Sequence, residues 1–252
     1  MAEENRNERL KTEAERIFAA AREEKLEARL LGGMAVYLSS PSTRNAPFAR
    51  EVQDLDFIVA RKKAYSFSKL LERIGFEGDH EFNSIHGESR MLFSSDFTDI
   101  DVFVGDFQQC HALDLEKYFR CTAGSIPLAC LLLTKLQIVQ INKKDILDTL
   151  ALLYDHEPKK EGDAEREIRL DQFDEVVCGD WGWYTTVTDN LLKIERLLPE
   201  LGFGPEDESM LLSRIRILLT EAEGAPKSLK WKMRAKIGRK MQWYDLPEEK
   251  VL

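Results

Sequence analysis

The sequence has few of the features that would set it apart from ordinary globular proteins. Its 252 residues include only 14 glycines and 8 prolines, while 43% are hydrophobic and 32% are charged. This composition excludes collagen-like, low-complexity and wholly disordered chains. The longest apolar stretch, around residues 128–133, is far shorter than the roughly 20 residues needed to span a bilayer. The first residues lack the charged-then-apolar order of a signal peptide. We therefore expect a soluble, cytoplasmic protein of one large or two modest domains.

Cysteine is scarce and irregularly placed. Cys110, Cys121, Cys130 and Cys178 stand 11, 9 and 48 positions apart. No pair has the two-residue spacing of a zinc knuckle or a redox motif. We expect reduced, mostly buried thiols rather than a disulfide framework.

Charge is unevenly distributed along the chain. The net charge is −9, but residues 227–252 carry +5 and the remainder carries −14. Basic residues and Trp231 alternate in the segment 227–240, and phosphate contacts with aromatic stacking are how proteins grip RNA. This segment is therefore a candidate RNA-binding surface. A solvated basic helix face that packs Trp231, Met233 and Ile237 inward explains the pattern equally well.

The N-terminal half has the pattern of an α/β protein. The first thirty residues place apolar positions at helical spacing, which predicts one amphipathic helix ending at Gly32-Gly33. A short helical segment (34–38) and a polar loop follow. Residues 54–59 and 99–104 predict two strands, with a helix over 63–74 and one or two further strands over 82–93 between them.

The C-terminal half has a helical pattern. Two helices are predicted over residues 128–141 and 144–154, separated by a break at Asn142. Further helices are expected over about 164–177, 183–201, 206–223 and 227–243. We infer an α/β unit over residues 1–120 and an α-helical unit over residues 121–252.

Three carboxylates lie on the two predicted strands. A strand places residues i and i+2 on one face, so Asp54 and Asp56 point together, and Asp101 has an equivalent setting on the second strand. Like charges at close range need a compensating cation, and hard oxygen ligands favour Mg²⁺. A solvated strand edge is the alternative. Aspartate is a poor strand residue, however, and two strands carry it beside apolar runs, which favours function. We expect Asp99 only to cap the strand entrance.

Gly32-Gly33 lies just upstream of the first two carboxylates. Glycine lets the backbone approach a ligand, and the free N–H groups at a helix start favour phosphate. A C-cap of the preceding helix is the alternative.

The order of Gly32-Gly33, Asp54-x-Asp56 and Asp101 resembles the DNA polymerase β-like nucleotidyltransferase superfamily. The chain resembles most the AbiEii-type branch, which includes toxin nucleotidyltransferases of bacterial toxin–antitoxin and phage-defence systems. The resemblance covers roughly residues 30–155. It implies an α/β fold, a small mixed β-sheet flanked by helices and followed by a helical domain. It also implies that Asp54, Asp56 and Asp101 hold Mg²⁺ and that Gly32 and Gly33 face the triphosphate.

Two features depart from the family pattern. Twenty residues separate Gly33 from Asp54, which is at or beyond the long end for this motif. Residues 50–53 also lack the threonine that usually stands two places before the first aspartate.

The AbiEii-type branch also carries a lysine after the sheet, then a basic-Asp pair and a further Asp. Here these are Lys135, Lys144-Asp145 and Asp148. Lys135 would neutralise phosphate charge in the transition state, and the others would complete the nucleotide site. The alternatives are a snorkelling surface lysine, and carboxylates that favour a helix dipole.

The resemblance implies a Mg²⁺-dependent transfer of a nucleoside monophosphate from an NTP to an acceptor hydroxyl, with Asp101 assisting its deprotonation. The acceptor could be RNA, particularly a tRNA 3′ end, a protein side chain or a small molecule such as an aminoglycoside. An antitoxin protein is an expected partner if the chain is a toxin. One rival is a non-catalytic nucleotide-binding or regulatory module. The other is a purely structural α/β domain, and only this second rival would bind neither NTP nor Mg²⁺.

Overall fold

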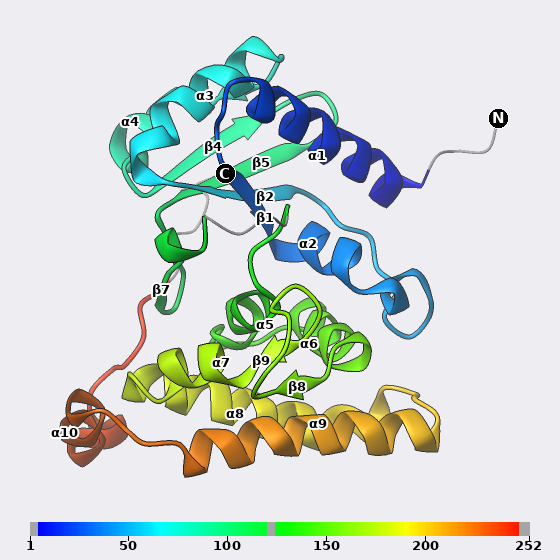
Figure 1. Ribbon diagram of the computed structural model, residues 1–252, viewed down its shortest axis with the longest axis vertical. Helices are drawn as coiled ribbons and strands as arrows, with labels where there is room; N and C mark the ends of the chain where they lie inside the picture. Colours follow the sequence, from blue (N-terminus) through cyan, green and yellow to red (C-terminus); the bar gives the residue numbers. More distant parts are fainter. Residues whose placement is uncertain (1–4, 120–123, 247–252) are drawn as a thin grey trace. The chain divides into compact units, whose positions relative to one another are not determined.

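The computed structural model describes residues 5–119 and 124–246 (Figure 1). The chain divides into two compact units, each of which is described by itself. We call residues 1–39, 50–108 and 114–126 the sheet unit, and residues 40–49, 109–113 and 127–252 the helical unit. Within the described ranges, no helix combines the length and apolar character needed to cross a membrane.

The structure consists of helices and short strands. The helices are α1 (Arg6–Glu23), α2 (Gly32–Ser39), α3 (Ala64–Arg73), α4 (His80–His86), α5 (Leu128–Leu136), α6 (Lys143–Asp155), α7 (Leu170–Val177), α8 (Trp181–Leu197), α9 (Pro205–Gly224) and α10 (Leu229–Ile237). The strands are β1 (Ala28–Leu31), β2 (Leu55–Val59), β3 (Glu77–Gly78), β4 (Arg90–Ser94), β5 (Asp99–Val104), β6 (Asp106–Gln108), β7 (Ala112–Asp114), β8 (Pro158–Lys159) and β9 (Ile168–Arg169).

The sheet unit is built on a mixed five-stranded sheet with the order β1-β2-β5-β4-β3. Strands β2 and β5 are parallel, and the other neighbours are antiparallel. The alternation of β2 turns Phe57 to one face, where its ring contacts Phe18 of α1 and Phe67 of α3. This face is the apolar core, and Asp56 points to the opposite face. The expected α/β class with a small mixed sheet is confirmed.

The prediction of a single helix over the first thirty residues is wrong. Helix α1 ends at Glu23, and Lys25 adopts a left-handed conformation with φ of 54°. Residues 28–31 then form β1, which pairs with β2. Leu26, Ala28 and Leu30 are buried at every second position, so the same apolar residues that fit a helix also fit a strand.

Two other predicted segments differ in type or extent. Residues 82–93 begin as helix α4, because the Asp79 side chain accepts from the backbone N–H of Phe82 and caps the helix. Only the later part of that segment enters strand β4. The helix expected over 164–177 begins at Leu170, after the short strand β9.

The helical unit surrounds one fully buried helix. All nine residues of α5 are buried, and α6, α7 and α8 pack against this helix. Helix α9 packs against α6, α7 and α8. The cysteines Cys110, Cys130 and Cys178 of this unit are buried free thiols, as expected, whereas Cys121 lies outside the described residues.

Candidate active site

Strands β2 and β5 bring two of the predicted carboxylates together. Asp56 and Asp101 are register partners across the parallel strands, whose spacing is about 4.8 Å. Register partners point to the same face, so the two side chains are neighbours. Asp56 is half-buried, whereas Asp101 is only 7% exposed. Asp54 is half-buried and lies just before β2, two residues ahead of Asp56.

Gly32 packs against the Asp56 carboxylate. It is the first residue of α2, directly after β1, and its φ is +68°. A Cβ atom built on Gly32 would lie 1.7 Å from Asp56 Oδ2, which no side chain could tolerate. Both its backbone conformation and this close approach therefore require glycine. The alternative that Gly32-Gly33 caps the N-terminal helix is wrong, because β1 separates them from α1.

Gly33 lies against the Arg50 side chain in the same way, and sequence reasoning did not identify Arg50 as a site residue. A Cβ atom on Gly33 would lie 2.6 Å from Arg50 Nη2. The Arg50 guanidinium therefore lies against the first turn of α2. Gly32 thus leaves room for the Asp56 carboxylate, and Gly33 leaves room for the Arg50 guanidinium.

Arg90 of β4 holds the Asp101 carboxylate, and sequence reasoning missed it. Arg90 Nε donates to Asp101 Oδ1 at 3.1 Å and Arg90 Nη2 donates to Oδ2 at 2.8 Å. The two side chains are 13% and 9% exposed. The guanidinium also lies 5.7 Å from the Phe82 ring centroid and 5.4 Å from that of Phe103. The only sequence signal was an arginine at the start of an apolar strand.

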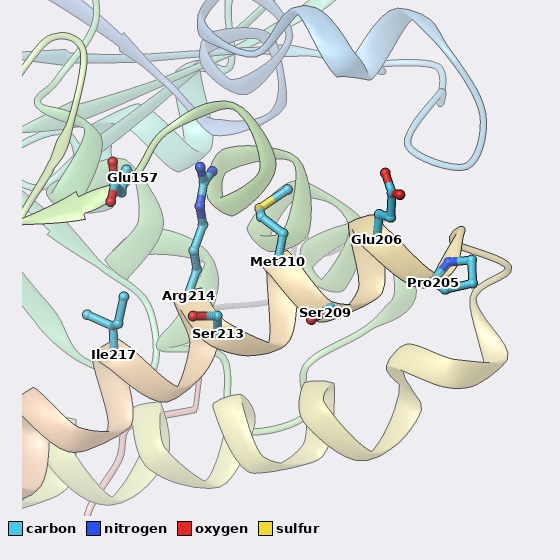
Figure 2. Close-up of a pocket in the computed structure, with 8 residues that line it drawn as sticks. All are labelled: Glu157, Pro205, Glu206, Ser209, Met210, Ser213, Arg214 and Ile217. Atoms are coloured by element: carbon cyan, nitrogen blue, oxygen red, sulfur yellow. The ribbon is translucent and has the colours of Figure 1, made fainter.

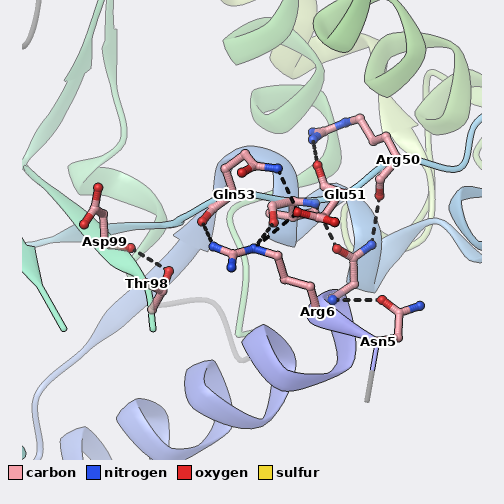
Figure 3. A network of polar contacts seen from close by, with 9 residues as sticks. Asn5, Arg6, Arg50, Glu51, Gln53, Thr98 and Asp99 are labelled. Carbon is pink, nitrogen blue, oxygen red and sulfur yellow. Dashed lines mark hydrogen bonds and ion pairs between the residues drawn. The ribbon is translucent and has the colours of Figure 1, made fainter. Parts of the chain in front are cut away.

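Hydrogen bonds from the start of α1 hold residues 50–53, the loop that precedes Asp54 and β2 (Figure 3). Asn7 Nδ2 donates to the carbonyl of Arg50 at 2.9 Å, and its Oδ1 accepts from the N–H of Val52 at 2.9 Å. The Arg6 guanidinium donates to the carbonyls of Val52 and Gln53, at 3.1 and 2.7 Å. Asn7 is 5% exposed, so its two contacts replace water for the backbone groups of Arg50 and Val52. They set the position of Arg50 and of the entry to β2.

Lys135 forms a second cluster, in the helical unit. Its Nζ lies 3.0 Å from Asp148 Oδ2 and 3.8 Å from Asp145 Oδ1. The Lys135 side chain is only 11% exposed, which excludes the alternative of a snorkelling surface residue. Asn142 accepts from the N–H of Asp145 and starts α6, so both acids lie in its first two turns. The predicted association of Lys135 with the two acids is therefore present, whereas Lys144 is exposed.

The residues fit a divalent cation by donor chemistry. Asp56 and Asp101 supply hard oxygen ligands on one face of the sheet, and the missing side chain of Gly32 gives Asp56 its position. In the part of the chain that the structure describes, no three His, Cys, Asp or Glu side chains are grouped to hold a metal. Mg²⁺ at Asp54, Asp56 and Asp101 stays a prediction.

The basic segment 227–240 contains helix α10 and turns its aromatic residue inward. The Trp231 ring meets the Tyr184 ring edge-on at 5.2 Å. Met233 and Ile237 are 64% and 41% exposed, so the expectation that they pack inward is wrong. The Tyr184 ring therefore contacts Trp231 within the protein. Exposed lysines lie along the segment at Lys230, Lys232, Lys236 and Lys240, whereas Lys227 is half-buried.

A groove of about 650 Å³ runs along α9 in the helical unit (Figure 2). Met210, Ser213 and Ile217 line it together with Glu157 and Arg214. Arg214 is already engaged, because its Nη1 donates to the carbonyls of Leu153 and Tyr154. None of the predicted site residues lines this groove, and it offers no arrangement for catalysis.

Comparisons with known proteins add a distant structural likeness. No protein-family model matches the chain, and no curated protein matches it. Among solved structures, the chain is similar to a crystal structure of ANT(2″)-Ia in complex with adenylyl-2″-tobramycin. The TM-score is 0.37 and the identity 16%, over 56% of this chain and 86% of that chain. At this TM-score and identity the likeness carries no functional assignment.

Proposed function

We propose that the protein is a Mg²⁺-dependent nucleotidyltransferase that moves a nucleoside monophosphate from an NTP to an acceptor hydroxyl. The observation that carries the proposal is the Asp56–Asp101 pair, in register on parallel strands, with Gly32 against Asp56. Acids on neighbouring strands cost repulsion, and aspartate is unfavourable in strands, so stability alone does not account for them. The resemblance to the AbiEii-type branch gives these residues a common chemistry.

In the proposed reaction the acceptor oxygen attacks the α-phosphorus of the NTP. The bond from that phosphorus to the oxygen bridging to the β-phosphorus breaks, and pyrophosphate leaves with the electron pair. The hydroxyl proton passes to Asp101, whose carboxylate has lone pairs beyond the two that Arg90 occupies. When bound at Asp54, Asp56 and Asp101, Mg²⁺ would neutralise phosphate charge.

Two groups of residues would position the nucleotide. The N–H groups of the first turn of α2 and the guanidinium of Arg50 meet at Gly33, and both attract phosphate oxygens. Asn7 and Arg6 hold the loop that carries Arg50. Lys135 remains a predicted catalytic residue, and Lys144, Asp145 and Asp148 remain predicted nucleotide-binding residues, all assigned by resemblance.

The acceptor class is the open part of the proposal. The exposed lysines of segment 227–240 favour an RNA acceptor such as a tRNA 3′ end over a small molecule. A toxin role with an antitoxin partner is proposed from the family resemblance alone. The rival is a nucleotide-binding or regulatory module that does not catalyse transfer.

The test uses purified protein, Mg²⁺, each α-labelled NTP in turn and total tRNA, with an Asp54→Asn/Asp56→Asn double variant beside the parent. Transfer of label by the parent alone supports the proposal. NTP binding that requires Mg²⁺ and these aspartates, without transfer to tRNA, protein or aminoglycoside acceptors, supports the non-catalytic rival. Neither transfer nor binding contradicts both.

A further inference from the structure

Arg90 and Asp101 form a buried, two-point ion pair beside the proposed reaction centre. Each of two guanidinium nitrogens donates to a different carboxylate oxygen, at 3.1 and 2.8 Å. Side-chain exposures of 13% and 9% contrast with the Arg61–Asp106 pair, whose side chains are 53% and 39% exposed. A pair so shielded from water is held in one geometry, because few water molecules can compete for its hydrogen bonds.

The charges around Asp101 explain why a cation is needed there. Asp56 is its register partner on one side, and apolar Leu92 is its partner on the other. A second carboxylate and an apolar strand both disfavour an isolated negative charge on Asp101. Arg90 supplies the compensating charge from the antiparallel strand β4.

Arg90 donates to both oxygens of the Asp101 carboxylate. A divalent cation ligated by Asp101 would lie close to the guanidinium, whose like charge repels it, and would take over the neutralising role of Arg90. The rings of Phe82 and Phe103, 5.7 and 5.4 Å from the guanidinium, present aromatic faces that attract a cation released from a carboxylate.

We propose that Arg90 is the internal counter-ion of Asp101 and that a divalent cation binds the Asp56–Asp101 pair in exchange for it. The inference rests on the proposed function, since it takes the Asp56–Asp101 pair as the metal site. Arg90 is thus a positioning residue that holds the Asp101 carboxylate in one orientation until metal and nucleotide arrive. It also lowers the affinity of the empty site for metal, so that metal binding is coupled to release of Arg90.

The test measures thermal unfolding and calorimetric Mg²⁺ binding on the full chain. The parent is compared with Arg90→Gln and with Arg61→Gln, the matched control that breaks the exposed Arg61–Asp106 pair. In EDTA, Arg90→Gln should lower Tm by about 6 °C or more, because Asp101 loses its buried partner. Mg²⁺ should then raise its Tm more than that of the parent and bind about tenfold more tightly, whereas Arg61→Gln should behave as the parent.

Two further variants keep the result decisive. If Arg90→Gln does not fold without metal, Arg90→Lys keeps the charge with a single donor group and should bind Mg²⁺ more tightly than the parent. Adding Asp101→Asn to Arg90→Gln should restore Tm in EDTA and abolish the additional Mg²⁺ response, since neither charge remains.

The outcomes separate the inference from the proposed function. A Mg²⁺ response equal to or weaker than that of the parent in both Arg90 variants overturns the exchange and leaves the metal site intact. No binding of Mg²⁺ to the parent or to any variant overturns the metal site and the exchange together.

Discussion

The sheet unit and the helical unit each bury a basic residue against acids, but in different ways. Arg90 meets one carboxylate with two nitrogens, whereas the single Nζ of Lys135 lies between Asp148 and Asp145, at 3.0 and 3.8 Å. A guanidinium fork fixes the orientation of its partner, while an ammonium acts as a compact charge. The comparison suggests that orientation matters at Asp101 and charge at Lys135.

The largest effect is expected from removing the lysine of the helical unit. Lys135→Met leaves Asp148, whose side chain is 4% exposed, without its cation. Breaking a buried pair in this way costs about 3–5 kcal/mol. Urea unfolding should show this loss, and Lys69→Met, which breaks an exposed pair with Glu72, should leave the urea midpoint nearly unchanged. Equal effects of the two substitutions would contradict the role of burial.

A smaller loss is expected from adding one methyl group to the sheet unit. Gly32→Ala forces a Cβ into the space of Asp56 Oδ2 and strains a residue with positive φ. Together these effects cost about 2–4 kcal/mol. Gly75 also has positive φ, but a Cβ there meets nothing within 4 Å, so Gly75→Ala isolates the backbone cost of about 1–2 kcal/mol.

The readout for the glycine pair is both denaturant unfolding and label transfer. Gly32→Ala should lose transfer as well as stability, because Asp56 must move, while Gly75→Ala should keep transfer. A Gly32→Ala protein as active as Gly75→Ala would show that the position of Asp56 is not important.

The helical unit also buries a group that is uncharged at neutral pH, and this predicts the smallest effect. Burial lowers the pKa of His111 to about 4, against 6.5 for the exposed ring. The folded state therefore resists a proton that the unfolded state accepts, and stability falls as pH decreases from 6.5 to 4. At pH 5 the loss is about 2 kcal/mol relative to pH 8.

Replacing His111 with Gln removes this titration, so the stability of the variant should depend less on pH in that range. Unfolding midpoints measured in urea at pH 5, 6 and 8 provide the test. An equally steep fall in the variant would assign the acid sensitivity to other groups.

Local patterns were enough to predict the strands that carry the candidate site. Alternation of Asp with apolar residues located strands at residues 54–59 and 99–104. The structure has β2 over Leu55–Val59 and β5 over Asp99–Val104. Local pattern failed for residues 26–31, where the buried positions fit both periods and only pairing with β2 selects a strand. It also missed α4, whose start depends on the cap at Asp79.

The site residues that could not be predicted from the sequence depend on contacts between distant segments. Arg90 reaches Asp101 because β4 and β5 are antiparallel with Leu92 opposite Asp101. Asn7 reaches residues 50 and 52 from the first turn of α1. Neither registry is encoded in a short window of sequence. The acids that hold Lys135 were assigned from the family resemblance, which supplied the association that the residue pattern alone did not.

The most direct test of the central claim compares two aspartates of the same strand. Asp99 and Asp101 lie two residues apart on β5, but Asp99 is exposed and Asp101 is paired in register with Asp56. Transfer of α-labelled NTP should fall at least about a hundredfold in Asp101→Asn and stay near the parent level in Asp99→Asn. Equal transfer by the two variants would contradict a reaction centre at the Asp56–Asp101 pair.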